Sequence, residues 1–177
     1  MRRLADAATI RRFMRELGEA ADISARVFLT GGATAVLVGW RASTIDVDVK
    51  IVPESDRIFR AIPALKERLH LNVELASPDD FIPVPPGWEE RSPFIAQEGR
   101  LAFHHFDLYA QALAKLERGH TQDVADVHEM LRRELIVTAQ ARAYFDRLER
   151  DLYRYPAVDP ATFRAAVDAA LGPADRP

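Results

Sequence analysis

Seven consecutive residues, Ile45–Ile51, alternate strictly between apolar and polar side chains. Side chains alternate between the two faces of a β-strand, so this period predicts a strand with one apolar and one polar face. The apolar face would pack on helices while the polar face stays open. Asp46 and Asp48 share the open face, with Cβ atoms about 7 Å apart.

A second unit lies just upstream of this strand. Arg26–Thr30 is β-branched and aromatic, which favours a strand, and the run stops at Gly31-Gly32. Ala33–Gly39 then has the composition of a short helix. Glycines at such a junction lack a Cβ, so backbone N–H groups at the helix N-terminus can approach a phosphate closely. A tight strand-to-helix turn without a ligand explains an isolated Gly-Gly pair equally well.

Periodicity places further helices and strands around these two units. Helices are expected at Leu4–Ala21 and Glu54–His70, with Pro63 as the weak point of the second. Leu71–Leu75 is expected to be a strand with Leu71, Val73 and Leu75 on one face. A connection punctuated by Pro, Asp and Gly follows, and two short strands are expected near its end, at Phe94–Ala96 and Leu101–Phe103.

The remainder of the chain has a helical pattern. Amphipathic segments that open on Asp or Thr as N-caps are Asp107–Arg118, Thr121–Glu134, Thr138–Tyr153 and Asp159–Leu171. The sequence therefore predicts an α+β fold, with a small mixed sheet and flanking helices at residues 1–105 and a C-terminal helical bundle at residues 106–177.

Composition excludes several classes of function. The net charge is −3, so no global positive charge indicates nucleic-acid binding, and the absence of cysteine excludes disulfides, a thiolate nucleophile and Cys-ligated metals. The longest apolar stretch, Val27–Trp40, is shorter than the ~20 residues of a membrane span. We expect no membrane association, no signal peptide and a cytoplasmic location.

Two carboxylates on one strand face repel each other unless a positive charge lies between them. Hard oxygen ligands suit Mg²⁺ or Mn²⁺, which commonly keep waters and substrate phosphates as their remaining ligands. Asp46 and Asp48 are therefore candidate metal ligands. The alternative is an exposed strand whose aspartates face water.

The order of these motifs carries a resemblance. Thr30-Gly31-Gly32-Ala33, a short helix, Arg41–Thr44 and then Asp46-Val47-Asp48 resemble the signature of the DNA polymerase β-type nucleotidyltransferases. The similarity is greatest to small prokaryotic members related to abortive-infection and toxin–antitoxin nucleotidyltransferases. The resemblance implies that Gly31 and Gly32 contact the triphosphate of an NTP, that Asp46 and Asp48 hold two Mg²⁺ ions, and that Ser43 or Thr44 assists the phosphates.

The family usually has a third carboxylate on the neighbouring strand. Glu74 is the matching residue here, because it alternates with Val73 and shares the polar side of its strand with Asn72. Asp79 and Asp80 are alternatives, and an exposed glutamate without a role is a further one. Glu in place of the more common Asp is a departure, and without a third acid the chain would be a degenerate, binding-only member.

The helical half offers one more candidate. Lys115 lies at the border of an apolar stripe, so its stem is expected to be packed and its ammonium directed into a groove. In related proteins a lysine on this helix binds nucleotide phosphates, with an aspartate nearby on the next helix. Asp126 matches that aspartate. Asp123 falls in an apolar arc, where a carboxylate needs a partner, unless it simply lies in the first turn and is stabilised by the helix dipole.

Histidines do not form a recognisable metal site in this sequence. His104 and His105 are adjacent, so on a strand they would point to opposite faces and could not easily share one metal ion.

These features together predict a metal-dependent nucleotidyltransferase. It would move an NMP group from ATP or another NTP to an RNA such as tRNA, a protein or a small molecule, in association with a cognate toxin or antitoxin. The alternative is a catalytically degenerate binding module of such a pair. Metal-dependent hydrolysis on the same acidic strand is a third option.

Overall fold

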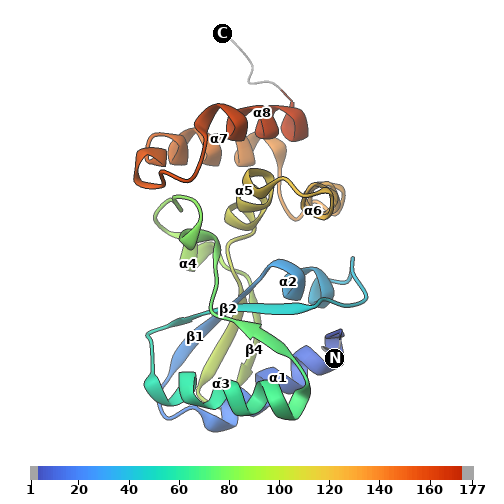
Figure 1. The fold of residues 1–177 in the computed structure, drawn as a ribbon, viewed down its shortest axis with the longest axis vertical. Coiled ribbons are helices and arrows are strands. Elements are labelled where there is room, and N and C mark those ends of the chain that lie inside the picture. The colour runs from blue at the N-terminus through green and yellow to red at the C-terminus, as the bar shows by residue number, and fades with distance from the viewer. Residues whose placement is uncertain (1–3, 173–177) are drawn as a thin grey trace. The chain divides into compact units, whose positions relative to one another are not determined.

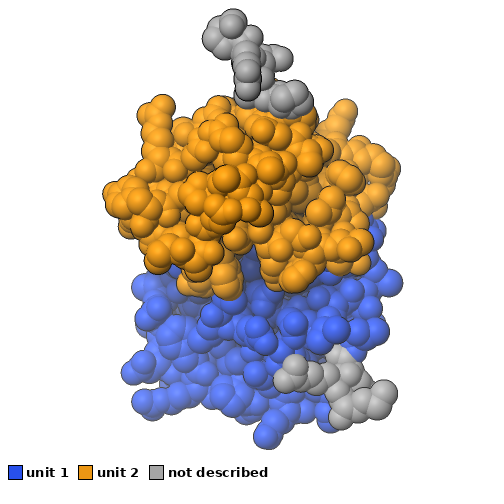
Figure 2. Space-filling model, turned by 45° about the horizontal axis from the view of Figure 1, so that its top comes forward, with its two compact units in different colours: residues 1–77, 92–106 blue, residues 78–91, 107–177 orange. Residues whose placement is uncertain are grey.

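A computed structural model describes residues 4–172 (Figure 1). These residues form two compact units, shown in blue and orange in Figure 2. The first contains the chain up to Ser77 together with Ser92–Phe106, and the second contains Pro78–Arg91 together with the helices after Asp107. The sequence suggested one boundary between residues 105 and 106, whereas in the structure residues 78–91 also group with the C-terminal helices.

The first unit is built on a five-stranded sheet in the order β3-β2-β1-β5-β4. The central strand β1 (Ala25–Thr30) runs antiparallel to β2 (Asp46–Val52) and parallel to β5 (Leu101–His105). The edges are β3 (Asn72–Glu74), parallel to β2, and β4 (Phe94–Glu98), antiparallel to β5. The expected mixed sheet is confirmed.

Three helices cover one face of this sheet: α1 (Ala7–Ala20), α2 (Gly31–Val38) and α3 (Asp56–Leu69). Helix α1 packs beside α3, as Figure 1 shows, and α2 lies against β2. The alternating apolar residues of the strands, such as Val47 and Val49, are buried beneath these helices. Asp46 and Asp48 therefore lie on the opposite face.

Helix α3 continues through Pro63, the expected weak point. Its apolar stripe, which includes Ile58 and Leu65, is buried, and Ser55 caps its N-terminus by accepting a hydrogen bond from the Ile58 N–H. Burial of that stripe outweighs the backbone donor that proline lacks. The expected helix at Leu4–Ala21 begins later than predicted, since Asp6 is the N-cap of α1 and Ala5 bridges to Thr44.

Two apolar residues do not lie where alternation placed them. Ile45 and Leu75 were expected on the buried face, but 54% and 57% of their surfaces are exposed. Ile45 precedes the first residue of β2, and Leu75 follows the last residue of β3. Strand pairing no longer dictates the side-chain direction at these positions, so the prediction was wrong there.

The second unit is helical. Its elements are η1 (Pro78–Asp80), α4 (Trp88–Arg91), α5 (Leu108–Arg118), α6 (Thr121–Arg132), α7 (Thr138–Glu149), η2 (Leu152–Arg154) and α8 (Pro160–Leu171). The sequence predicted four of these helices, with α6 and α7 too long, and treated 78–91 as a connection. None of the helices within residues 4–172 is long and apolar enough to cross a membrane.

A polar cluster ties the 78–91 segment to the helices. Arg91 donates through Nε to the Asp107 carboxylate at 2.8 Å, and the Tyr144 hydroxyl donates to the same oxygen at 2.7 Å. Arg91 also donates to the backbone oxygens of Pro85 and Pro86. Asp107 is completely buried, so these donors compensate for the loss of its hydration. Burial and the Asp107 charge raise the pKa of Tyr144 well above its usual value, and the phenol stays a donor.

Candidate functional site

The polar face of the sheet brings four polar side chains of β2 and β3 into register. Asp46 lies opposite Asn72, and Asp48 lies opposite Glu74. On its other side Asp48 pairs with Thr30, the residue after which α2 begins. Parallel pairing keeps residues of one face together, so the two aspartates and Glu74 share the open face.

The Gly31-Gly32 turn approaches this carboxylate strand closely. Gly31 has φ +61°, in the left-handed region, and a Cβ at this position would lie 3.1 Å from Asp48 Oδ2. A Cβ on Gly32 would lie 2.0 Å from Thr44 Oγ1 and 3.5 Å from an Arg41 guanidinium nitrogen. Any larger residue at position 32 would occupy space that Thr44 fills. The turn, a carboxylate, a hydroxyl and a cation are thus neighbours.

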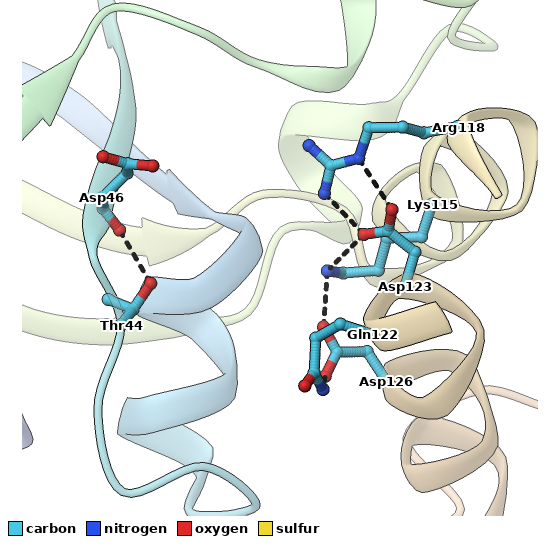
Figure 3. Close-up of polar contacts among 7 residues, drawn as sticks. All are labelled: Thr44, Asp46, Lys115, Arg118, Gln122, Asp123 and Asp126. Carbon is cyan, nitrogen blue, oxygen red and sulfur yellow. Dashed lines mark hydrogen bonds and ion pairs between the residues drawn. The ribbon is translucent and has the colours of Figure 1, made fainter. Parts of the chain in front are cut away.

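Thr44 is held firmly at this turn. Its backbone N–H and C=O exchange hydrogen bonds of 2.9 and 2.7 Å with Ala5. Its hydroxyl donates to the backbone oxygen of Asp46 at 3.1 Å, as Figure 3 shows. Ser43, the alternative phosphate contact, is half-buried on the same loop. The structure therefore fixes Thr44 beside the glycine turn.

An amide bridges the two strands. Asn72, which is 7% exposed, donates through Nδ2 to Asp46 Oδ1 at 2.6 Å and to Glu74 Oε1 at 2.9 Å. Sequence reasoning placed Asn72 and Glu74 on one face but assigned no role to Asn72. Only the β2–β3 register shows that its amide faces Asp46.

His105 supports the glycine turn from the other face of the sheet. Its Nδ1 lies 3.0 Å from Thr34 Oγ1, and Thr34 donates to the Leu29 backbone oxygen. Burial, followed by the charge of Arg11, lowers the pKa of His105 to about 4, so the ring is neutral at neutral pH. His104 contacts the Ser92 backbone instead, which confirms that the two histidines point to opposite faces.

Lys115 belongs to the second unit and is almost fully buried there. Its ammonium donates to Asp126 Oδ2 at 2.7 Å and lies 3.7 Å from Asp123 Oδ1, and these contacts appear in Figure 3. Arg118 donates to both oxygens of Asp123. Burial raises the pKa of Asp123, but the Arg118 hydrogen bonds and the Lys115 charge outweigh it and hold that pKa below its usual value. The partner expected for Asp123 is therefore present, and the Lys115 ammonium binds two carboxylates.

The donor set on the open face has the chemistry that a divalent cation requires. Asp46, Asp48 and Glu74 offer carboxylate oxygens, the ligands of Mg²⁺ and Mn²⁺. Among residues 4–172, no three or more His, Asp or Glu side chains already converge in an arrangement that could hold a metal ion. Magnesium is commonly bound by one or two carboxylates together with substrate phosphates, and the aspartate pair fits that mode.

A mixed sheet covered by helices on one face, with a Gly-Gly turn beside an Asp-x-Asp strand, has the plan of a nucleotidyltransferase core. Residues 6–150 match the family model described as a nucleotidyltransferase of unknown function (DUF6036). The match spans most of the chain, which therefore belongs to that family. Searches of curated proteins and of solved structures gave no match.

Proposed function

We propose that this protein transfers an NMP group from an NTP to an acceptor hydroxyl in a reaction that depends on Mg²⁺ or Mn²⁺. Membership of a nucleotidyltransferase family supports the reaction class. The observation that carries the proposal is the close approach of the Gly31-Gly32 turn to Asp48 and Thr44. A nucleoside triphosphate requires a turn that binds its phosphates and ligands for its metal ion, and candidates for both lie at one end of one strand pair.

Gly31 and Gly32 would receive the phosphates. They form the first turn of α2, at the positive end of the helix dipole, and no acidic residue of that turn opposes an anion. Arg41 adds a cation beside Gly32, and the Thr44 hydroxyl adds a polar group. A side chain at either glycine would displace the ligand or the groups that hold it.

Asp46 and Asp48 would hold the divalent cation, with Glu74 as the third carboxylate. When bound, that cation neutralises charge on the triphosphate and on the leaving pyrophosphate. The acceptor oxygen forms a bond to the α-phosphorus as the bond to the β-phosphate oxygen breaks. Glu74 is exposed and accepts from Asn72 through Oε1, so its Oε2 would take the acceptor proton.

Lys115 is proposed as a neutraliser of phosphate charge. Its ammonium has three donors, and one is used in the short bond to Asp126. To bind phosphate, Lys115 would have to share its charge with Asp126 and Asp123 or release them. This requirement makes the role of Lys115 a separate question from that of the glycine turn.

The acceptor and the biological partner are proposed on the resemblance alone. An RNA end such as that of tRNA, a protein hydroxyl or a small molecule would each need only local contacts. A cognate toxin or antitoxin protein is the corresponding partner.

The test uses α-labelled NTPs with Mg²⁺ or Mn²⁺ and a panel of RNAs, proteins and small hydroxyl compounds. Wild-type protein should label one acceptor class and release pyrophosphate. Asp46→Asn and Asp48→Asn should lower transfer by at least 100-fold, whereas Glu98→Gln, a carboxylate change on β4, should not. Transfer that survives both aspartate substitutions would refute the assignment. Release of NMP without a labelled acceptor would indicate hydrolysis instead.

A second candidate is a nucleotidyltransferase-fold binding module without catalysis. One observation favours it: two carboxylates already neutralise the Lys115 ammonium. Such a module would form a complex with an NTP, an RNA or a protein but transfer no label. The same experiment, read by complex formation as well as by labelling, separates the two functions.

A further inference from the structure

The side chain of Asn72 has an unusual position for a neutral residue, because it lies between two carboxylates. It is nearly buried on β3, and its Nδ2 atom donates to Asp46 at 2.6 Å and to Glu74 at 2.9 Å. An amide nitrogen has two hydrogens, so each carboxylate receives one. Both donors of Asn72 are therefore used at the candidate metal site.

This arrangement compensates for like charges without adding a charge. Asp46 and Glu74 come from neighbouring strands and would repel each other if nothing lay between them. A lysine in place of Asn72 would neutralise one carboxylate and compete with a cation. The amide instead orients both groups and leaves their full negative charge available to a cation.

The bond to Asn72 also leaves a coordinating oxygen on Asp46. Asn72 binds Oδ1, so Asp46 can present Oδ2 to a cation while its carboxylate plane is held in place. Hydrogen-bonded partners that orient metal-binding carboxylates typically change metal affinity 10- to 100-fold when they are removed.

We infer that Asn72 is a positioning residue, whose amide holds the Asp46 and Glu74 carboxylates in the arrangement that receives a divalent cation. The inference rests on the proposed function, because it assumes that these carboxylates bind a metal ion. It adds a residue to which neither the family resemblance nor the sequence pattern gave a role.

The experiment measures Mn²⁺ binding by electron paramagnetic resonance, with no nucleotide and no acceptor. Asn72→Ala should weaken Mn²⁺ binding by about tenfold. If Asn72→Ala does not fold, Asn72→Ser, which keeps one donor, takes its place and should weaken binding several-fold. As a control, Gln97→Ala removes a side-chain amide of β4 that donates to the Gly99 backbone oxygen, and this variant should bind Mn²⁺ as the wild type does.

A second measurement follows thermal unfolding in EDTA and in excess Mn²⁺. Mn²⁺ should raise the Tm of the wild type more than that of Asn72→Ala, because a ligand that binds the folded state more tightly stabilises it more. If Asn72 had a structural role alone, Asn72→Ala would lower the Tm equally in both conditions.

The outcomes separate this inference from the proposed function. Weakened Mn²⁺ binding in Asn72→Ala supports the inference, even where no acceptor is ever labelled and the transferase proposal fails. If Asn72→Ala, or Asn72→Ser in its place, binds Mn²⁺ with an affinity within twofold of wild type, the inference is overturned, but the proposed function is not affected. Wild-type protein that binds no Mn²⁺ in the absence of nucleotide overturns the inference, whereas the proposed function, in which substrate phosphates complete the cation site, is tested by the transfer assay.

Discussion

Replacing Gly32 by alanine tests the close approach of the glycine turn to the carboxylate strand. The new Cβ would lie 2.0 Å from Thr44 Oγ1 and 2.7 Å from Thr44 Cβ. Ordinary contacts begin near 3.4 Å, so Thr44 and the turn must separate by about 1.4 Å. Thr44 cannot move easily, because two backbone hydrogen bonds join it to Ala5.

We expect Gly32→Ala to lower the free energy of unfolding by about 2–3 kcal/mol, the upper part of the range for an overpacked site. It should also weaken NTP binding by at least tenfold, because the turn and the strand end can no longer keep their spacing. Chemical denaturation gives the first quantity, and titration with a fluorescent NTP in Mg²⁺ gives the second.

Gly39→Ala is the matched control. Gly39 has φ +105°, and a Cβ added to it would meet no other group within 4 Å, so the substitution costs backbone strain without crowding. It should destabilise the protein by about 1–2 kcal/mol and leave nucleotide affinity unchanged. If Gly32→Ala were as stable as wild type and bound NTP equally well, the proposed phosphate site at the Gly31-Gly32 turn would be refuted.

Two further predictions concern buried charged or titratable groups. His105 has a pKa of about 4 when folded against an ordinary 6.5, so its contribution to stability is complete above pH 6.5 and is lost as the pH falls towards 4. The free energy of unfolding should drop by about 2 kcal/mol more between pH 7 and pH 5 in wild type than in His105→Gln. Chemical denaturation at the two pH values measures both drops, and equal drops would contradict the lowered pKa of His105. Lys115→Met leaves the buried Asp126 without its ammonium and should cost about 3–5 kcal/mol. Arg118→Met should cost less, about 1–2 kcal/mol, because Arg118 is 60% exposed and the Lys115 ammonium still lies 3.7 Å from Asp123. Similar losses of unfolding free energy in the two variants would show that burial does not determine how much the Lys115–Asp126 ion pair stabilises the protein.

Much of the fold follows from local pattern. The alternation in Ile45–Ile51 predicted β2 and put both aspartates on its polar face. The Gly-Gly stop after Arg26–Thr30 predicted the β1–α2 junction. These features depend on period and on backbone freedom, which neighbouring residues specify.

Pattern was less informative where pairing ends. Ile45 and Leu75 continue the alternation but lie just outside their ladders, and they point into solvent. The segment 78–91 has no strong period, and long-range bonds from Arg91 to Asp107 and Tyr144 give it its place among the helices. Local sequence contains no information on such partners.

The candidate site, like the fold, was predicted from the sequence only in part. Residue order named the glycine turn, Asp46 and Asp48 as candidates for one site, since each type has a distinct chemistry, and the family resemblance added Glu74. The pairing of β3 with β2 was needed to show that Asn72 faces Asp46, and the packing of α5 on α6 to show that Lys115 already binds two aspartates. Chemical type and alternation are properties of neighbouring residues, whereas hydrogen-bond partners distant in the chain exist only after strands and helices have packed together.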